Sequence, residues 1–204
     1  LLGMKVLPPD VNLSFESKYL VKDNCLILPL SSIRNVGGVI SKTIVEERCK
    51  KPFIDIFDFL RRTYPKTNNI KVLESLCYSH ALSSFGYNIA TLITNMDKIL
   101  NYMDLKPEIT YIPEYEMDFI LEKEKELFGF YLTSHRTEKY KNDRKVIDLN
   151  MLEKNLNRYV SVVVCIDKIK ELQTKKNDTM AFLTGSDNTG SIPVVVFPKM
   201  YLEF

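Results

Sequence analysis

The stretch "SSIRNVGGVISKTIVEER", residues 31–48, places two adjacent glycines, Gly37 and Gly38, between one apolar turn and another. Glycine adopts a positive φ without a steric penalty, so this pair predicts a tight hairpin between a short helix and a longer one. A helix that begins at such a turn points its first backbone N–H groups outward, and those groups bind anions such as phosphate. The stretch therefore predicts a helical hairpin with an anion-binding end.

Basic side chains follow the glycines along the chain, and they would attract a nucleic-acid backbone without selecting a base sequence. A plain packing corner with solvated charges fits the same spacing equally well, so both interpretations stay open at this point. If the hairpin binds DNA, the candidate backbone-binding residues are Arg34, Asn35, Val36, Gly37, Gly38, Lys42, Arg48, Lys50 and Lys51.

Composition sets the broad class of protein. The chain has 204 residues, of which 45% are hydrophobic, which is enough for one good core or two smaller ones. Its 28 basic and 26 acidic residues give a net charge of +2, too balanced to establish or exclude a nucleic-acid partner. The four cysteines form no C-x-x-C pair, and no apolar run reaches the ~20 residues of a membrane span. We expect a protein of the reducing cytoplasm without a metal site.

The periodicity of apolar residues changes along the chain and predicts an α+β protein. Residues 1–30 contain short β-rich runs, whose pairing partners we expect to lie outside a chain that starts without Met and in mid-pattern. Residues 31–100 have helical spacing, and 114–135 predicts an amphipathic helix that ends at Gly129. Between them, 101–117 has the composition of a linker. Strands are predicted over 159–166, 179–184 and 192–197.

Four motifs resemble, in order, those of the bacterial replicative DNA polymerase III alpha subunit family. "MKVLPPDVNLSF" (4–15) resembles the end of its fingers domain, and "IRNVGGVISKTIVEER" (33–48), followed by "IFDFLRR", resembles its helix-hairpin-helix region. "EKEKELFGFYLTSH" (122–135) resembles its "E…LG-F-Y-L-S-G-H-P" signature, and "MAFLTGSDNTGSIPVVVFP" (180–198) resembles its OB-fold hairpin. Together the motifs cover most of the chain.

The resemblance implies a domain order and a role. Residues 1–30 correspond to the end of the fingers domain, 31–100 to a helix-hairpin-helix DNA-binding module, 101–158 to a linker and connecting helix, and 159–204 to a truncated OB-fold. The fold class is thus a helical module followed by a partial β-barrel. The implied role is non-catalytic: the module holds duplex backbone and guides the template strand of a replicative nucleotidyltransferase. Its partners are double- and single-stranded DNA, the sliding clamp and other replisome subunits.

Catalytic residues and cofactors are not expected in this chain. Polymerase chemistry needs acidic side chains that hold two Mg²⁺ ions about 4 Å apart, and the Asp and Glu residues here lie in helical charge patterns or turns. In the family that the chain resembles, the catalytic aspartates and Mg²⁺ belong to a palm domain outside this segment. His80 and His135 have no ligand partners at metal-binding spacing, so packing or surface roles are predicted for both.

The OB-fold resemblance suggests a second nucleic-acid surface. OB-folds bind single strands by stacking bases on aromatic side chains and by following phosphates with basic loops. Lys175 and Lys176 are the candidate contacts, because they lie at the tip of the loop between the first two predicted strands. Phe182 and Phe197 are predicted to be core residues.

Several departures from the family pattern support an alternative. Asn35 replaces a glycine but tolerates the left-handed conformation. In the second hairpin His80 replaces a glycine, and Ile89 stands where an arginine is usual, which weakens the case for a phosphate contact there. The alternative is a replisome scaffold whose DNA contacts have decayed. "NYMDLK" (101–106) is a weak candidate for the family's clamp-binding peptide, because the usual glutamine and phenylalanine are absent.

Overall fold

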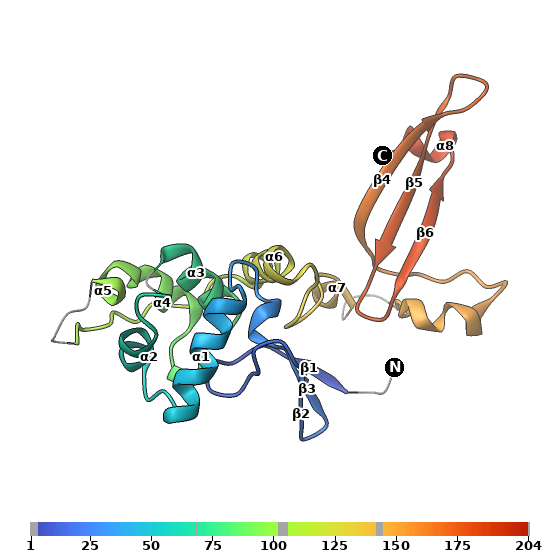
Figure 1. The fold of residues 1–204 in the computed structure, drawn as a ribbon. Coiled ribbons are helices and arrows are strands. Elements are labelled where there is room, and N and C mark those ends of the chain that lie inside the picture. The colour runs from blue at the N-terminus through green and yellow to red at the C-terminus, as the bar shows by residue number, and fades with distance from the viewer. Residues whose placement is uncertain (1–3, 68, 102–105, 142–144, 204) are drawn as a thin grey trace. The chain divides into compact units, whose positions relative to one another are not determined.

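The computed structural model describes residues 4–67, 69–101, 106–141 and 145–203. The chain forms two compact units, Leu1–Thr133 and Ser134–Phe204, each with its own strands and helices (Figure 1). The mixture of helices with two three-stranded sheets confirms the predicted α+β class. The two units are described separately below.

A small sheet opens the first unit. Its strands are β1 (Lys5–Leu7), β2 (Leu20–Lys22) and β3 (Cys25–Ile27), in the order β1-β3-β2. β1 runs parallel to β3 and β2 antiparallel, with Asp23 and Asn24 at positive φ in the β2–β3 turn. The expectation that these strands pair outside the chain was wrong, because they pair with one another.

Short helices make up the rest of the first unit. Three of them begin at a side-chain cap, since Asp55, Asn69 and Asn88 each accept a hydrogen bond from a backbone N–H in the first turn. Gly129, at φ 83°, ends the last helix at the predicted residue. The elements are η1 (Leu30–Ser32), α1 (Gly38–Lys50), α2 (Ile56–Thr63), α3 (Ile70–Tyr78), η2 (Ser83–Phe85), α4 (Ile89–Thr94), α5 (Met96–Leu100) and α6 (Met117–Phe128).

The chain reverses between η1 and α1 in a way that corrects the sequence argument. Asn35, at φ 70°, is the left-handed residue, whereas Gly37 has a φ of −71° and is the N-cap of α1. One left-handed residue is enough to turn the chain, and asparagine tolerates that conformation better than other non-glycine residues. The Asn35 side chain also donates to Ser75 Oγ of α3 at 3.1 Å. We call residues 30–41 the first hairpin and residues 76–91 the second hairpin.

A single hydrophobic core joins both hairpins to α2. Ile33 and Val36 enter it from the first hairpin, Ala81 and Leu82 from the second, and Phe59 of α2 has no exposed surface. Burying a side chain of this size contributes ~1.5–3 kcal/mol. The turns that carry the candidate phosphate contacts are therefore held by their own buried apolar residues.

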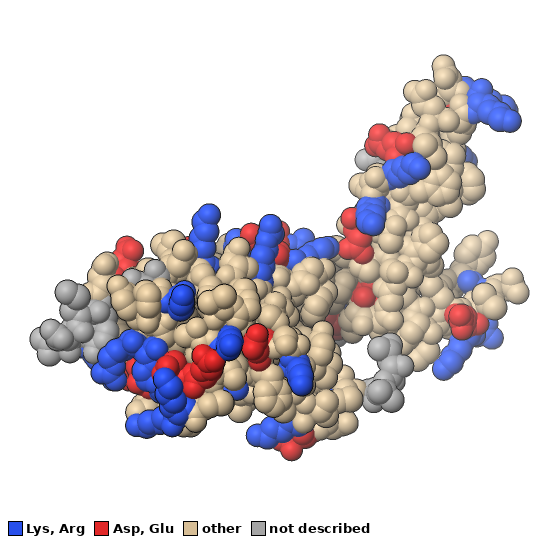
Figure 2. All heavy atoms as spheres, viewed as in Figure 1, with Lys and Arg blue, Asp and Glu red and all other residues tan. Residues whose placement is uncertain are grey.

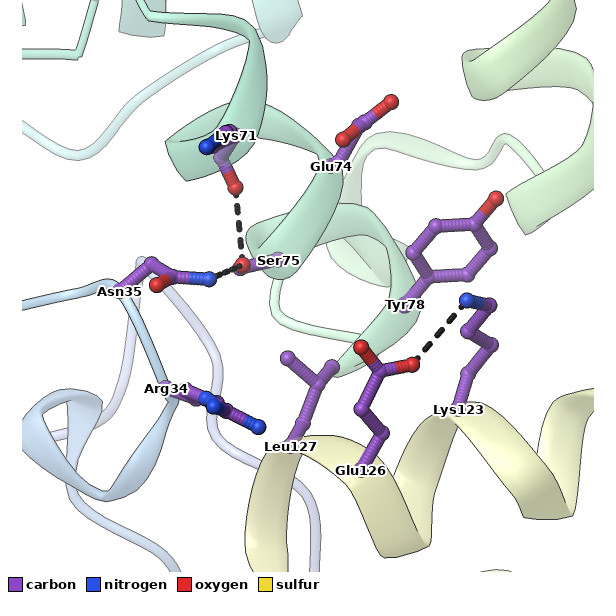
Figure 3. A pocket seen from close by; sticks show the side chains of 9 residues that line it. All are labelled: Arg34, Asn35, Lys71, Glu74, Ser75, Tyr78, Lys123, Glu126 and Leu127. Carbon is purple, nitrogen blue, oxygen red and sulfur yellow. Dashed lines mark hydrogen bonds and ion pairs between the residues drawn. The ribbon is translucent and has the colours of Figure 1, made fainter.

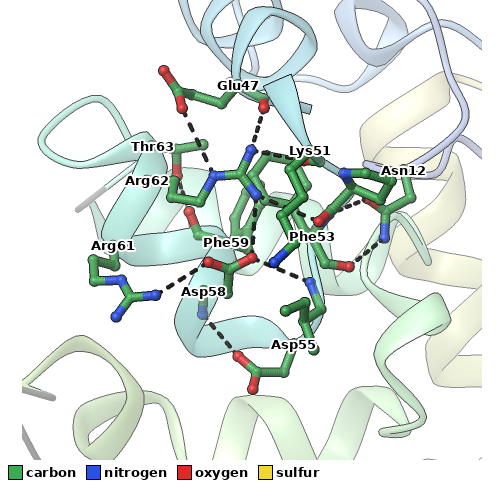
Figure 4. Close-up of polar contacts among 12 residues, drawn as sticks. Asn12, Glu47, Lys51, Phe53, Asp55, Asp58, Phe59, Arg61, Arg62 and Thr63 are labelled. Carbon is green, nitrogen blue, oxygen red and sulfur yellow. Dashed lines mark hydrogen bonds and ion pairs between the residues drawn. The ribbon is translucent and has the colours of Figure 1, made fainter. Parts of the chain in front are cut away.

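Arg62 joins the end of α1 to α2 (Figure 4). Its guanidinium donates to the carbonyls of Glu47 and Lys51, and it pairs with Asp58 Oδ2 at 3.2 Å. It also lies 4.6 Å from the centroid of the Phe53 ring. The last carbonyls of a helix lack intrahelical donors, and Arg62 supplies one to Lys51 O. The carbonyl of Glu47 accepts from Arg62 in addition to the Lys51 N–H, which is 3.4 Å away.

The second unit contains an antiparallel sheet. Its strands β4 (Cys165–Gln173), β5 (Thr179–Ser186) and β6 (Ser191–Val196) pair in the order β4-β5-β6. Pro193 lies on β6, which pairs only with β5 in the described chain, so the missing N–H of proline is tolerated at an edge. The other elements of the unit are α7 (Glu138–Lys141), η3 (Leu149–Asn155) and α8 (Pro198–Tyr201).

The first strand of this sheet lies later in the chain than its sequence predicted. The apolar run 159–166 was expected to form it, but β4 begins at Cys165 and continues through the charged residues up to Gln173. Pairing decides the outcome, because β4 is in register with β5 from Cys165↔Ser186 to Gln173↔Thr179, with a bulge near Ile166. Most β4 side chains are exposed. The strand therefore needs no run of apolar residues, and apolar spacing does not mark it in the sequence.

We expect Arg62→Met to lower the free energy of unfolding of the first unit by about 2–3 kcal/mol, because it removes charge-assisted hydrogen bonds to two carbonyls and to Asp58. Arg61→Met is the matched control, since Arg61 is 69% exposed and only pairs with Asp58 at 3.3 Å. Its effect should stay within about 0.5 kcal/mol. Urea denaturation followed by far-ultraviolet circular dichroism measures both, and equal losses would contradict the assigned role of Arg62.

Candidate nucleic-acid interface

The N-terminus of α1 is an open set of backbone donors. Gly37, its N-cap, has no side chain to accept the first amides, and Gly37 and Gly38 are exposed. The first amides of an α-helix have no intrahelical acceptor. A Cβ on Gly37 would meet nothing within 4 Å, and one on Gly38 would meet only Glu16 Oε1 at 3.9 Å. Packing within the chain does not demand glycine here, so their absent side chains leave the amides accessible from outside.

Two of the predicted basic residues lie near this helix end. Arg34 is exposed in the turn, next to Asn35. Lys42 lies one turn into α1, where its Nζ is 3.8 Å from Glu46 Oε1, and both side chains are more than half exposed. Such an exposed pair is worth at most about 1 kcal/mol, so Lys42 can exchange Glu46 for a phosphate at little cost. Val36 has a buried side chain and offers only its backbone.

The other three predicted cations lie elsewhere. Arg48 donates from Nη1 to the carbonyls of Val11 and Ser14, at 3.2 and 2.6 Å, and its burial lowers the pKa of the guanidinium. Lys50 and Lys51 lie at the other end of a 13-residue helix, roughly 18 Å from Gly38 at 1.5 Å per residue. The sequence grouped all five cations around the hairpin. The structure leaves two there, because a helix separates its two ends and Arg48 binds the N-terminal segment.

Charges of both signs cover this side of the first unit (Figure 2). On the face drawn, Lys and Arg are interspersed with Asp and Glu, and the densest group of blue side chains, at the lower left, also contains red ones. Interspersed charges of this kind give only a weak general attraction to DNA. Binding by the first hairpin would therefore depend on local geometry at α1 more than on a broad field.

The second hairpin has the fold expected of a relative of the first. His80 adopts φ 64°, at the position where the resemblance places a glycine, and Ala81 N donates to Leu76 O at 3.0 Å across the helix end. Its following helix, however, has occupied amides. The N–H groups of Ile89 and Ala90 each donate to the carboxylate of Glu114 at 3.0 Å. An internal anion thus occupies the place where a phosphate would bind.

The segment 106–116, predicted as a linker, is bound along α4. Thr110 exchanges two hydrogen bonds with the side-chain amide of Asn95, at 2.9 and 3.1 Å. Ile112 O accepts from Asn88 Nδ2 at 2.9 Å, which is a further contact of the same kind. Asparagine side chains thus supply peptide-like partners to a segment without regular structure. These contacts hold Glu114 at the second hairpin.

Glu124 is a fully buried carboxylate on α6 that the sequence analysis did not single out. It accepts hydrogen bonds from the backbone amides of Leu132 and Thr133 at 2.7 and 2.9 Å, and from the Thr133 hydroxyl. His80 Nε2 lies 3.2 Å from its Oε1. Burial alone would raise the pKa of Glu124, but the hydrogen bonds from His80, Thr133 and Leu132 lower it overall. The group joins the second hairpin to the turn that follows α6.

The candidate contacts of the second unit lie at the end of the β4–β5 hairpin. Lys175 and Lys176 are exposed in its loop, and blue spheres mark this end of the unit in Figure 2. Phe182 is 43% exposed and Phe197 64% exposed, so the predicted core positions of both were wrong. On the sheet, Phe182 stands between its register partners Lys170 and Val195. The described residues do not fully cover the rings of Phe182 and Phe197.

The remaining sequence predictions concern metal binding, membrane spans, the candidate clamp-binding peptide and His135. Among the described residues, no group of three or more His, Cys, Asp or Glu side chains is placed to hold a metal ion. No described helix has the length and apolar character that crossing a bilayer requires. Met103, Asp104 and Leu105, the centre of the candidate clamp-binding peptide, lie outside the described residues. His135 Nδ1 lies 2.9 Å from Thr137 Oγ1, a local contact.

Comparison with known proteins finds a helix-hairpin-helix match and several similar polymerase subunits. A family model described as a helix-hairpin-helix motif matches residues 3–92, which include both hairpins. The chain is 32% identical to the DNA polymerase III subunit alpha of Bacillus subtilis and 31% identical to that of Staphylococcus epidermidis, over 98% of its own length. It is 30% identical to that of Staphylococcus aureus over 99%. The chain spans about a fifth of the length of these relatives, since 20% of each is covered.

Acid should destabilise the first unit partly through Glu124. Its lowered folded-state pKa means that the stabilisation is fully present above about pH 4.3, the ordinary pKa of an unfolded glutamate, and is lost as the pH falls through the folded value. Glu124→Gln should therefore flatten the fall in stability below about pH 4.3. Urea midpoints measured from neutral to acidic pH test this, with the exposed Glu122→Gln as control. Parallel curves for the wild type and Glu124→Gln would refute it.

Proposed function

From the homology of this chain to a segment of DNA polymerase III alpha subunits, we propose that it is a non-catalytic DNA-binding region of a replicative polymerase in the cytoplasm. In this proposal the first hairpin binds the phosphate backbone of duplex DNA. The contacts are the amides at the start of α1, with Arg34 and Lys42 beside them. The binding would be independent of base sequence, because contacts to the phosphate backbone carry no sequence information.

The observation that carries the proposal is the accessible N-terminus of α1. Its N-cap is a glycine, and the positions of both glycines have room for a side chain that the sequence does not supply. The amides and the positive end of the helix dipole favour an anion at this point. Asn35 supports the geometry, because its left-handed φ and its bond to Ser75 fix the direction from which α1 starts.

We also propose that the second unit contacts single-stranded template DNA as a partial OB-fold. Lys175 and Lys176 would bind phosphates at the loop tip, and the partly exposed Phe182 would offer a ring for base stacking. Lys170, its register partner on β4, adds a cation beside that ring.

A second candidate function is a scaffold that docks other replisome subunits or the sliding clamp. Glu114 favours it, because it occupies the α4 amides of the second hairpin and so removes one of two expected DNA contacts. Arg48 also favours it, since its guanidinium binds carbonyls within the chain. The first hairpin, with its unoccupied helix end, favours DNA.

Binding of a fluorescent primer-template duplex across a salt series distinguishes the two functions. We expect the wild type to bind with an affinity that falls steeply with salt, and the Arg34→Ala/Lys42→Ala variant to lose affinity and about two units of the slope of log K against log salt. Lys50→Ala/Lys51→Ala removes the same charge from the far end of α1 and is the matched control. Absence of binding by the wild type, or equal losses in both variants, would refute binding at the first hairpin.

Gly38→Ala separates a DNA contact from a packing corner. The new methyl group would meet only Glu16 Oε1, at 3.9 Å, so stability should stay the same or rise by up to about 1 kcal/mol. If the α1 amides contact phosphate, the same methyl group should weaken duplex binding several-fold, because it stands between the amides and the ligand. Thermal unfolding and duplex titration of one variant give both numbers. Unchanged DNA affinity would contradict a close approach at Gly38.

A further inference from the structure

A polar pocket lies beside the first hairpin, within the first unit (Figure 3). It has a volume of about 330 Å³ and is walled by three elements that are distant in the sequence. The turn of the first hairpin supplies Arg34 and Asn35, α3 supplies Lys71, Glu74 and Tyr78, and α6 closes the remaining side. The pocket is therefore a product of the fold, and no motif in the sequence indicates it.

Some of its charged groups already have partners. Lys123 of α6 pairs with Glu126 at 3.1 Å, and its Nζ lies 5.4 Å from the centre of the Tyr78 ring. Arg34 and Lys71 are exposed and form no ion pair within the part of the chain that the structure describes. Two cations from different elements thus border one pocket without an ion-pair partner among the described residues.

The rest of the lining narrows the class of ligand. Glu74 offers a carboxylate that accepts hydrogen bonds but repels a second carboxylate. Tyr78 and Leu127 form an apolar wall, and burial, with Tyr115 and Glu74 nearby, raises the pKa of Tyr78 to about 12, so its hydroxyl stays neutral at physiological pH. Glu74 repels the carboxylates of an acidic peptide and the phosphate of a nucleotide alike. A nucleotide, however, carries its charge on the phosphate alone, and its sugar and base add N–H or O–H donors for Glu74 and a flat ring for Tyr78.

We propose that this pocket binds one unpaired nucleotide of a DNA strand, with the phosphate between Arg34 and Lys71 and the sugar and base toward Glu74 and Tyr78. The volume of about 330 Å³ lies at the small end of ligand pockets, which suits a single nucleotide better than a base pair. The proposal rests on the proposed function, because DNA bound at the first hairpin brings the strand past Arg34. It adds a preference for duplex with a single-stranded end.

The test uses the 204-residue chain, a blunt duplex and the same duplex with a short single-stranded tail, at one salt concentration. The tail should tighten binding roughly tenfold, the gain expected of one well-bound nucleotide. Lys71→Gln should abolish that gain and leave affinity for the blunt duplex equal to that of Lys66→Gln. Lys66 is an exposed lysine outside the pocket and provides the matched charge change.

The outcomes separate this proposal from the one on which it rests. Equal wild-type affinity for blunt and tailed duplex, or a gain that Lys71→Gln retains, overturns the pocket and leaves duplex binding at the first hairpin intact. If no duplex binds, the proposed DNA contact at the first hairpin is refuted. The pocket is then tested separately by nuclear magnetic resonance. A shift of the Tyr78 ring signals with 5′-dAMP but not with deoxyadenosine then supports the nucleotide site, with free nucleotide as its source. No shift overturns it.

Discussion

The left-handed backbone of Asn35 is the constraint on which the first unit depends. It reverses the chain between η1 and α1, so that Ile33 and Val36 enter the core on either side of it and the start of α1 faces outward. The side-chain bond to Ser75 fixes this turn against α3, so the orientation of the helix end and one wall of the pocket are set by the same residue. A glycine at this position would allow the turn but could not make that bond.

The two hairpins show how one local geometry leads to opposite surfaces. Both turns contain a left-handed non-glycine residue, Asn35 or His80, and both are followed by a helix. The first helix begins at a bare glycine, whereas the amides of the second are bound by Glu114 from a segment more than twenty residues away. The difference in the accessibility of the first helix amides therefore comes from a tertiary contact and not from the hairpin itself.

Buried and half-buried polar side chains hold parts of the helical unit together in addition to the apolar core. Arg62 completes the end of α1, Glu124 organises the turn after α6, and Asn95 binds the segment that carries Glu114. Each satisfies backbone groups that have no partner in regular structure, which is costly when such groups are buried. The cations used in this way, Arg48 above all, are thereby removed from the surface available to DNA.

Apolar spacing and turn chemistry in the sequence were sufficient to predict the α+β class, the helices of residues 31–100, the end of α6 at Gly129 and the strands β5 and β6, because these depend on local periodicity. The sequence also placed Arg34, Lys42 and the two glycines in one candidate site. Tertiary structure alone decided that Arg48 points inward, that Glu114 occupies the second hairpin and that β4 begins at Cys165. Those outcomes depend on partners distant in the sequence, and residue types at one position do not show which distant group will satisfy them.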